Sequence, residues 1–304
     1  MPRKQRIEYP GAVYHIISRG NYRKDLFTHD KTAEAFERAL FETAERCEWK
    51  LYAYVIMSNH YHLAIETPKP NLVDGMRWLQ STFATRFNRF RNERGHVFQG
   101  RYKSILIKED RPLLGLIDYI HLNPVRAGIC SVDKLKSHAR SSYPKYFKRS
   151  VSLPLDRKTF FQLADLPDSL GGMRKYAERL KLVEESDPKQ REALTRKYCR
   201  GWFLGSKKAK KELSNELDES NPGVDWEGVD LKELNELNWE RIVKAEMKRL
   251  GKRSADIAAD PKGADWKGAI AKRLRKETTA KNRWIAERLR MGYPNYVSLL
   301  IHKA

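Results

Sequence analysis

The 304-residue sequence has few of the features that define secreted, membrane-spanning or zinc-binding proteins. Its three cysteines, Cys47, Cys130 and Cys199, are odd in number, far apart and not arranged as CxxC. They exclude a disulfide framework and a zinc knuckle, and a reducing cytoplasm is the expected compartment. No apolar run approaches the ~20 residues that a membrane span needs. The N-terminus is basic but lacks the apolar stretch of a signal peptide.

Acidic residues are also scarce relative to basic ones. The chain has 39 Asp and Glu against 60 Lys and Arg, which gives a formal net charge of +21 and a pI of about 9.8. Such a surplus favours a polyanionic partner, either nucleic acid or an anionic membrane surface. The alternative is a basic surface with no partner. Hydrophobic residues make up 40% of the chain, enough for a packed core.

The first half of the chain alternates between the apolar periods of strands and helices. This order, β-α-β-β-α-β with one further helix, predicts an α+β fold with a ferredoxin-like (split βαβ) antiparallel sheet. In that topology the first and third strands lie in the middle of the sheet. The predicted strands are 12–18, 51–57, 60–67 and 101–107, and the predicted helices are 31–47, 73–93 and 111–122.

Beyond about residue 148 the chain is charged, and its pattern predicts helices and no strand. We expect an α+β domain over 1–147, a helical and linker region over 148–225, and an all-α domain over 226–304. The acidic stretch 214–230 is typical of a linker. The pattern from Ala286 to Gly292 resembles a DNA-binding helix-turn-helix, although Arg290 occupies the usual glycine position. Two generic packed helices are the alternative.

Two histidines are the first candidate for chemistry. His60 and His62 lie two apart on a predicted strand, so both imidazoles point to one face while Tyr61 points to the other. Two neutral imidazoles side by side supply much of a divalent-metal site. An isolated HxH is more often a pair of half-exposed polar residues, and here the strand order and the basic charge favour the metal site.

The second candidate lies on the predicted helix 111–122 and its end. Tyr119 and Asn123 are four residues apart and share a helix face, whereas Leu116 and Ile120 face the sheet. A free tyrosine, with a pKa of ~10, is a poor nucleophile, and a nearby cation activates it by stabilising the phenolate. The side-chain oxygen of Asn123 suits Mg²⁺ or Mn²⁺. Taken alone, a tyrosine is more often a packing residue.

Residues 8 to about 130 resemble the single-tyrosine HUH transposases (IS200-like), and most of all the REP-associated tyrosine transposases. The resemblance lies in four strings in order: YHIISRGNYRKDLF, YVIMSNHYHLAIETP, VFQGRYKSILI and YIHLNPVRAGI. It departs from the family at Tyr61, where a large aliphatic residue is usual. Pro124 also disfavours helical geometry at Asn123.

The resemblance implies a chemistry and a set of roles. Tyr119 attacks a phosphodiester of single-stranded DNA, a 5′-phosphotyrosine forms and a 3′-hydroxyl leaves. His60, His62 and Asn123 hold a divalent metal, Mg or Mn, and no nucleotide cofactor is needed. The expected partner is single-stranded, hairpin or repeat-associated DNA, and the chain acts as a monomer or homodimer.

Polar and basic residues near these motifs are the expected DNA contacts. They are Arg19, Asn21, Arg23, Lys24, Arg86, Arg101 and Lys103. Three alternatives stay open. One is a non-cleaving DNA- or RNA-binding regulator on the same fold. Another is an RNA-binding regulator on a ferredoxin-like sheet, which would need aromatics on the exposed sheet face where this chain places histidines. The third is a replication or relaxase-type nuclease. The last usually has a longer chain or a GxxxxGK[ST] motif, which is missing here.

Overall fold

The computed structural model describes residues 6–148, 154–220, 226 and 232–302. The chain forms two compact units. One is Glu8–Ser206, and the other is Lys207–Ala304 together with Met1–Ile7. The boundary therefore falls after Ser206 and not after residue 147, because helices that the sequence placed in a separate region pack on the sheet. Each unit is described here by itself.

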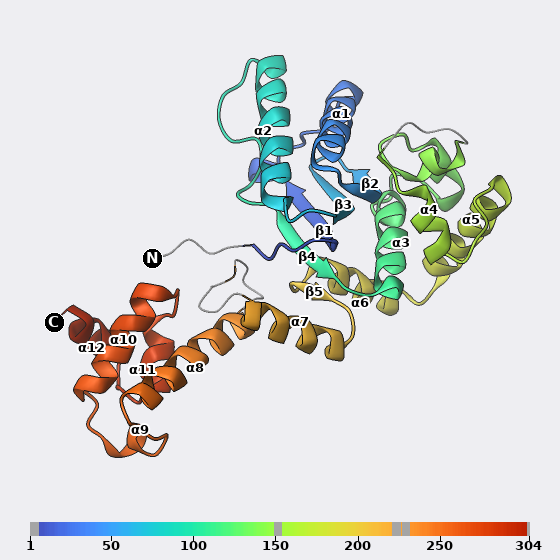
Figure 1. Ribbon diagram of the computed structural model, residues 1–304. Helices are drawn as coiled ribbons and strands as arrows, with labels where there is room; N and C mark the ends of the chain where they lie inside the picture. Colours follow the sequence, from blue (N-terminus) through green and yellow to red (C-terminus); the bar gives the residue numbers. More distant parts are fainter. Residues whose placement is uncertain (1–5, 149–153, 221–225, 227–231, 303–304) are drawn as a thin grey trace. The chain divides into compact units, whose positions relative to one another are not determined.

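The unit Glu8–Ser206 is built on a sheet with the strand order β2-β3-β1-β4-β5 over the described residues (Figure 1). β1 pairs antiparallel with β3 from Ala12↔Thr67 to Arg19↔His60, so the first and third strands are neighbours inside the sheet. A short fifth strand pairs parallel with β4, contrary to the expectation of no strand in the second half. This strand has only two residues, which is too short for an alternating apolar pattern, so the sequence did not predict it. The strands are β1 Ala12–Arg19, β2 Lys50–Ile56, β3 His60–Thr67, β4 Lys103–Ile107 and β5 Phe203–Leu204.

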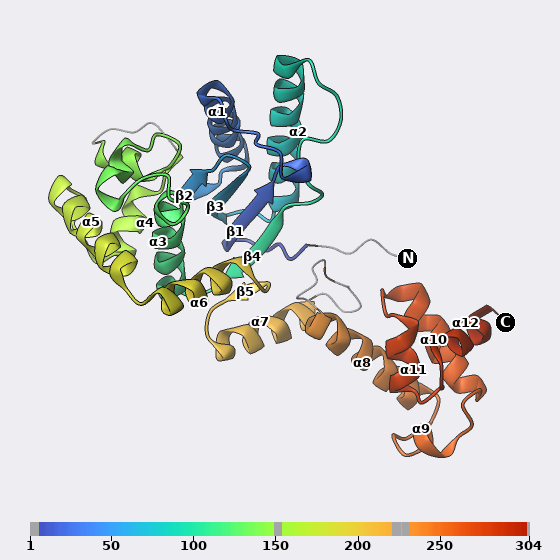
Figure 2. The same ribbon diagram turned by 180° about the vertical axis from the view of Figure 1, so that it is seen from behind.

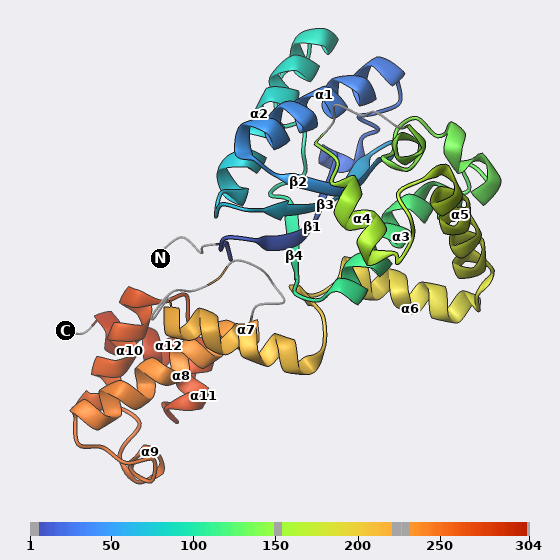
Figure 3. The ribbon, with the colours of Figure 1, turned by 45° about the vertical axis from the view of Figure 1, so that its right-hand side comes forward.

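Helices cover both faces of this sheet. α1 (Asp30–Cys47) and α2 (Leu72–Arg91) lie together on one face, and α3 (Asp110–Arg126) lies on the other (Figures 1 and 3). Tyr61 points to the α1 face, where its ring centroid is 4.4 Å from that of Phe36. Its side chain is fully buried, so the aromatic residue fills the core position that the family gives to an aliphatic one.

The helix α3 does not end before Pro124 as the sequence predicted, but continues to Arg126. Proline removes its own N–H donor from the helix, and its ring crowds the carbonyl four residues before it. The carbonyl of Asn123 still accepts a hydrogen bond from the N–H of Ala127 at 3.0 Å. The last turn therefore survives around the proline, and Asn123 stays on the helix one turn after Tyr119.

Three further helices form an outer layer on the α3 side of the sheet (Figure 2). They are α4 Arg157–Leu163, α5 Leu170–Glu185 and α6 Pro188–Cys199, and short 3₁₀ helices at Val132–Ser137 and Tyr143–Phe147 lie between α3 and α4 in sequence. Phe160, Met173 and Tyr176 are fully buried in the same hydrophobic cluster as the apolar side of α3. These residues are part of the core of Glu8–Ser206.

In the second unit, the described residues form helices and no strand. They are α7 Lys207–Ser220, α8 Lys232–Arg249, α9 Asp256–Ala259, α10 Asp265–Glu277, α11 Asn282–Arg288 and α12 Pro294–His302. The predicted linker 214–230 is helical up to Ser220, whereas 221–225 and 227–231 lie outside the described residues. None of the helices in the described parts of the chain has the length and apolarity to cross a membrane.

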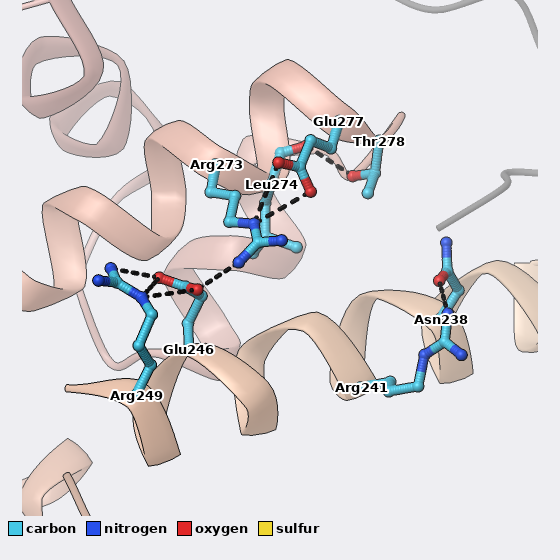
Figure 4. Close-up of polar contacts among 8 residues, drawn as sticks. All are labelled: Asn238, Arg241, Glu246, Arg249, Arg273, Leu274, Glu277 and Thr278. Atoms are coloured by element: carbon cyan, nitrogen blue, oxygen red, sulfur yellow. Dashed lines mark hydrogen bonds and ion pairs between the residues drawn. The ribbon is translucent and has the colours of Figure 1, made fainter. Parts of the chain in front are cut away.

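A charged network joins α8 to α10 in this unit. Figure 4 shows the carboxylate of Glu246 between the guanidinium groups of Arg249 and Arg273. Arg249 donates to Glu246 at 2.8 Å, and Arg273 also pairs with Glu277 on its own helix at 3.0 Å. The Glu246 side chain is only 4% exposed, so its charge depends on these partners.

The predicted helix-turn-helix corresponds to α11, a turn and α12. Arg290 in the turn has a positive φ of 50°, a left-handed conformation that favours glycine. Met291 in the same turn is fully buried, which holds the two helices together despite the arginine. The turn thus has the left-handed conformation that a glycine at position 290 would favour.

Candidate active site

The structure brings the predicted nucleophile and the predicted imidazoles together. His60 and His62 lie on β3 and face α3, and their ring centroids are 5.1 Å apart. The ring of Tyr119 on α3 lies edge-on to that of His62, with centroids 5.5 Å apart. Tyr119 is 5% exposed and His62 is 3% exposed. Alternation along β3 and the packing of α3 on the sheet produce this arrangement.

A third histidine, His15 on β1, belongs to the same cluster and was not singled out from the sequence. The β1–β3 register places Ile17 opposite His62, so His15 lies one pleat away on the same face. Its Nε2 is 2.9 Å from Nδ1 of His62, and its Nδ1 is 2.9 Å from the backbone oxygen of Tyr198. The alternation of β1 could have indicated the face, but only the strand register identifies the neighbour.

These contacts determine which nitrogen of each ring carries the proton. The oxygen of Tyr198 can only accept, so Nδ1 of His15 is the donor. A neutral His15 therefore accepts at Nε2, and Nδ1 of His62 must donate to it. Burial lowers the pKa of His15 to about 3 and lowers that of His62 well below its ordinary value, which keeps both rings neutral. The Nε2 lone pair of His62 is then free for another partner.

His60 is oriented in the same way. Asn59 donates its amide N–H to the backbone oxygen of Arg23 at 3.4 Å, so its Oδ1 is the atom that faces Nδ1 of His60, at 2.8 Å. Nδ1 of His60 therefore donates, and Nε2 keeps its lone pair. Burial lowers the pKa of His60 to about 4, with a further contribution from Arg19.

The two histidines thus have the chemistry of metal ligands. Metal-binding imidazoles typically donate their second N–H to a neighbouring acceptor, as both do here. Asn123 donates its amide N–H to the backbone oxygen of Tyr119 at 3.2 Å, which leaves its Oδ1 available as an oxygen ligand. Over the residues that the structure describes, no three His, Cys, Asp or Glu side chains are placed to hold a metal ion. The candidate donors are the two imidazoles on β3 and, on the facing helix α3, the amide oxygen of Asn123.

The hydroxyl of Tyr119 is covered by the end of α6. It lies 3.0 Å from Sγ of Cys199, and the ring of Tyr198 packs on its ring with centroids 5.3 Å apart. Burial raises the pKa of Tyr119, and Cys199 raises it further, whereas Asn123 and Arg126 lower it. The phenol is therefore protonated in this arrangement. Residues about 80 positions away could not be connected with Tyr119 from the sequence.

A glycine on α3 permits this close cover. A Cβ at Gly115 would come within 2.2 Å of the hydroxyl of Tyr198. On the other side, Nζ of Lys103 donates to the backbone oxygen of Cys199 at 3.1 Å. The end of α6 is thus in contact with α3 through Tyr198 and with β4 through Cys199.

The seven predicted DNA contacts fall in different surroundings. Arg19 is exposed at the end of β1, directly opposite His60 in the register. Lys24 pairs with Glu93 at 2.6 Å, and Lys103 is half-buried beside the active site. Arg86 lies on α2, over the other face of the sheet, and is paired with Glu42 at 2.9 Å. The other three also belong to this unit: Asn21 is half-buried, and Arg23 and Arg101 are exposed.

Comparison with known proteins finds a family match for part of this unit. Residues 9–123 match the family model described as "Transposase IS200 like". A Haemophilus influenzae protein named as a REP-associated tyrosine transposase is 26% identical over 127 residues, which span 38% of this chain and 71% of the relative. The resemblance inferred from the four sequence strings is therefore confirmed.

Two solved structures are remotely similar. A REP-associated tyrosine transposase bound to a REP hairpin aligns with 49% of this chain and 87% of its own, at 18% identity and a TM-score of 0.41. A protein from Deinococcus radiodurans described as a transposase aligns with 42% of this chain and 92% of its own, at 19% identity and a TM-score of 0.29.

Proposed function

Because residues 9–123 form an IS200-like transposase domain, of a class of enzymes that cleave and rejoin DNA, we propose that Tyr119 is the nucleophile of this reaction. Its hydroxyl attacks a phosphodiester of single-stranded DNA. The bond from the Tyr119 oxygen to phosphorus forms, the bond from phosphorus to the 3′ oxygen breaks, and a 3′-hydroxyl leaves with a proton. The 5′-phosphotyrosine conserves the bond energy, so rejoining needs no nucleotide cofactor.

The histidines and Asn123 are proposed to hold the divalent metal, Mg or Mn. Nε2 of His60, Nε2 of His62 and Oδ1 of Asn123 are the atoms that their hydrogen bonds leave available. The ion, when bound, polarises the phosphate and stabilises the departing oxygen. His15 positions His62 by accepting its N–H, and the backbone oxygen of Tyr198 positions His15.

The substrate is proposed to be single-stranded or hairpin DNA, associated with repeats. The four family strings support this, as does the net charge of +21, which suits a polyanion. Arg19 beside His60 and Lys103 beside Cys199 are the predicted contacts closest to the chemistry. We also assign β1 to β4 to the ferredoxin-like class, and α11 and α12 to target recognition rather than catalysis.

The observation that supports this function best is the edge-on contact between Tyr119 and His62 at 5.5 Å, inside a domain of this family. Tyr119→Phe removes only the hydroxyl, so it should abolish covalent adducts on a single-stranded hairpin library with Mg²⁺ or Mn²⁺, while DNA binding stays within a few fold. Tyr198→Phe is the matched control, because its ring packs on Tyr119 and its adducts should persist. Adducts formed by Tyr119→Phe, or full cleavage in EDTA, would contradict the mechanism. A protein that binds the hairpins and never forms an adduct would favour the non-cleaving regulator.

A further inference from the structure

A pocket of about 790 Å³ lies beside the candidate nucleophile, on the α3 side of the sheet. Tyr119 and Tyr198 form part of its wall, and the remainder comes mainly from α3, α5 and α6. Its volume is within the ~300–1,000 Å³ of typical small-ligand sites. Neither histidine of the predicted metal pair lines it, so it is a separate feature from the metal site.

The wall of this pocket is positively charged. Four cationic side chains line it, namely Arg111, Arg126, Arg179 and Lys197, and two carboxylates do so, Glu109 and Asp118. The formal surplus is 4 − 2 = +2. Asp118 accepts from Arg179 through Oδ2 at 2.8 Å, whereas its buried Oδ1 has no hydrogen-bond partner in the described structure. Glu109 accepts from the N–H of Ser206 at 2.7 Å. The remaining positive charge has no counterpart on the wall.

Arg126 is the cation of this wall that has a buried N–H group without a hydrogen-bond partner among the described residues. Its guanidinium carbon lies 5.3 Å from the centroid of the Tyr119 ring, and its side chain is 16% exposed. Its Nε reaches Glu184 at 3.4 Å, and Glu184 is shared with Arg191. Its Nη1 is buried and has no hydrogen-bond partner in the described structure. A buried guanidinium N–H without an acceptor is costly, and an anion in the pocket would satisfy it.

We propose that this pocket binds a backbone phosphate of the DNA strand, next to the phosphate that Tyr119 attacks, with Arg126 as its main ligand. The identity of the occupant rests on the proposed function. The strand is preferred to a free anion because Tyr119 is itself a wall of the pocket. A strand attached to Tyr119 therefore has its neighbouring phosphate within reach of Arg126. Guanidinium groups suit this role, since they donate two hydrogen bonds to one phosphate.

The test is calorimetric titration of the full-length protein with thymidine 3′,5′-bisphosphate, inorganic phosphate and a short oligothymidylate. Arg126→Gln should weaken the bisphosphate at least tenfold, and Arg126→Lys should recover part of the loss. Arg38→Gln, at a 63% exposed arginine on α1, is the matched control and should bind normally. Glu184→Gln should bind as tightly as the native protein or more tightly, because it removes only the competing carboxylate.

Several results would overturn the proposal. One is native affinity in Arg126→Gln. Another is an equal loss in Glu184→Gln, which would make the arginine part of a structural ion pair. Binding of inorganic phosphate that the oligothymidylate cannot displace would indicate a free-anion site. If Arg126→Gln does not fold, Lys197→Gln is the substitute test. Lys197 is exposed, so its replacement should leave the fold intact, and it should weaken bisphosphate binding several-fold. Tyr119→Phe should still bind the bisphosphate. A native protein that binds the bisphosphate but forms no adduct would count against Tyr119 as the nucleophile and not against the pocket.

Discussion

Phe160→Ala tests whether residues 157–206 belong to the core of the catalytic unit. Phe160 is fully buried, and its ring lies 4.4 Å from that of Tyr146 and 4.9 Å from that of Tyr176 between centroids. Truncation of a buried phenylalanine removes its transfer free energy and leaves a cavity, and the usual cost is about 3–5 kcal/mol. A unit of this size loses roughly 2–4 °C in Tm per kcal/mol, so the expected shift is about 6–20 °C.

The measurement is differential scanning calorimetry with parallel urea unfolding of the full chain. The transition that contains the catalytic sheet should move, and near-ultraviolet circular dichroism should follow the same curve. Phe90→Ala is the control, since Phe90 is 61% exposed on α2 and its loss should change stability by less than ~0.5 kcal/mol. If Phe160→Ala shifts only a separate, weaker transition, residues 157–206 form their own region and the boundary after Ser206 is wrong.

Three further predictions follow from the same contacts. A chain ending at Ser206 should stay folded and form the Tyr119 adduct. A chain ending at residue 147 should expose the apolar side of α3 and aggregate, which size-exclusion chromatography would show. A soluble, active 1–147 fragment would contradict this prediction. His15→Leu should lower Mn²⁺ affinity about 10–100-fold in an electron paramagnetic resonance titration, because His62 loses the acceptor that orients it; unchanged affinity would remove His15 from the site. Glu246→Gln should destabilise the second unit by about 2 kcal/mol at pH 7, since charged hydrogen bonds contribute ~1.5–3 kcal/mol. Its arginine partners hold the pKa of Glu246 below its ordinary 4.5, so this stability is present above about pH 4.5 and is lost as pH falls through the lower folded pKa. A stability difference between the two proteins that does not shrink as the pH is lowered below 4.5 would refute the charge argument.

The residues packed around Tyr119 affect its proposed role as the nucleophile. The hydroxyl lies against Cys199, and the pKa of the phenol is raised by burial. The proposed attack by Tyr119 would need the opposite condition, a phenolate stabilised by cations. Arg126 already lowers the pKa of Tyr119 through its charge, and a divalent ion beside His62 would add to that effect. Arg126 acts on the tyrosine from the side of the pocket, and the proposed ion would act from the side of the histidines.

Sequence alone was sufficient for features that depend on local periodicity. The alternation along β3 put His60 and His62 on one face and Tyr61 on the other, and the four-residue spacing on α3 put Tyr119 and Asn123 together. The boundaries of the first strands and helices follow from the same periods. The family resemblance, carried by four strings, is confirmed for residues 9–123.

Tertiary structure alone decided the contacts between residues distant in the chain. His15 joins the site because the β1–β3 register sets it one pleat from His62, and a register depends on pairing energies that one strand does not contain. Tyr198 and Cys199 reach Tyr119 because α6 and β5 close over the sheet edge. The helix continues past Pro124, where the N–H of Ala127 donates a hydrogen bond to the carbonyl of Asn123. The local sequence pattern specifies which face of a strand or helix a side chain occupies, whereas packing over the whole unit specifies which residues it contacts.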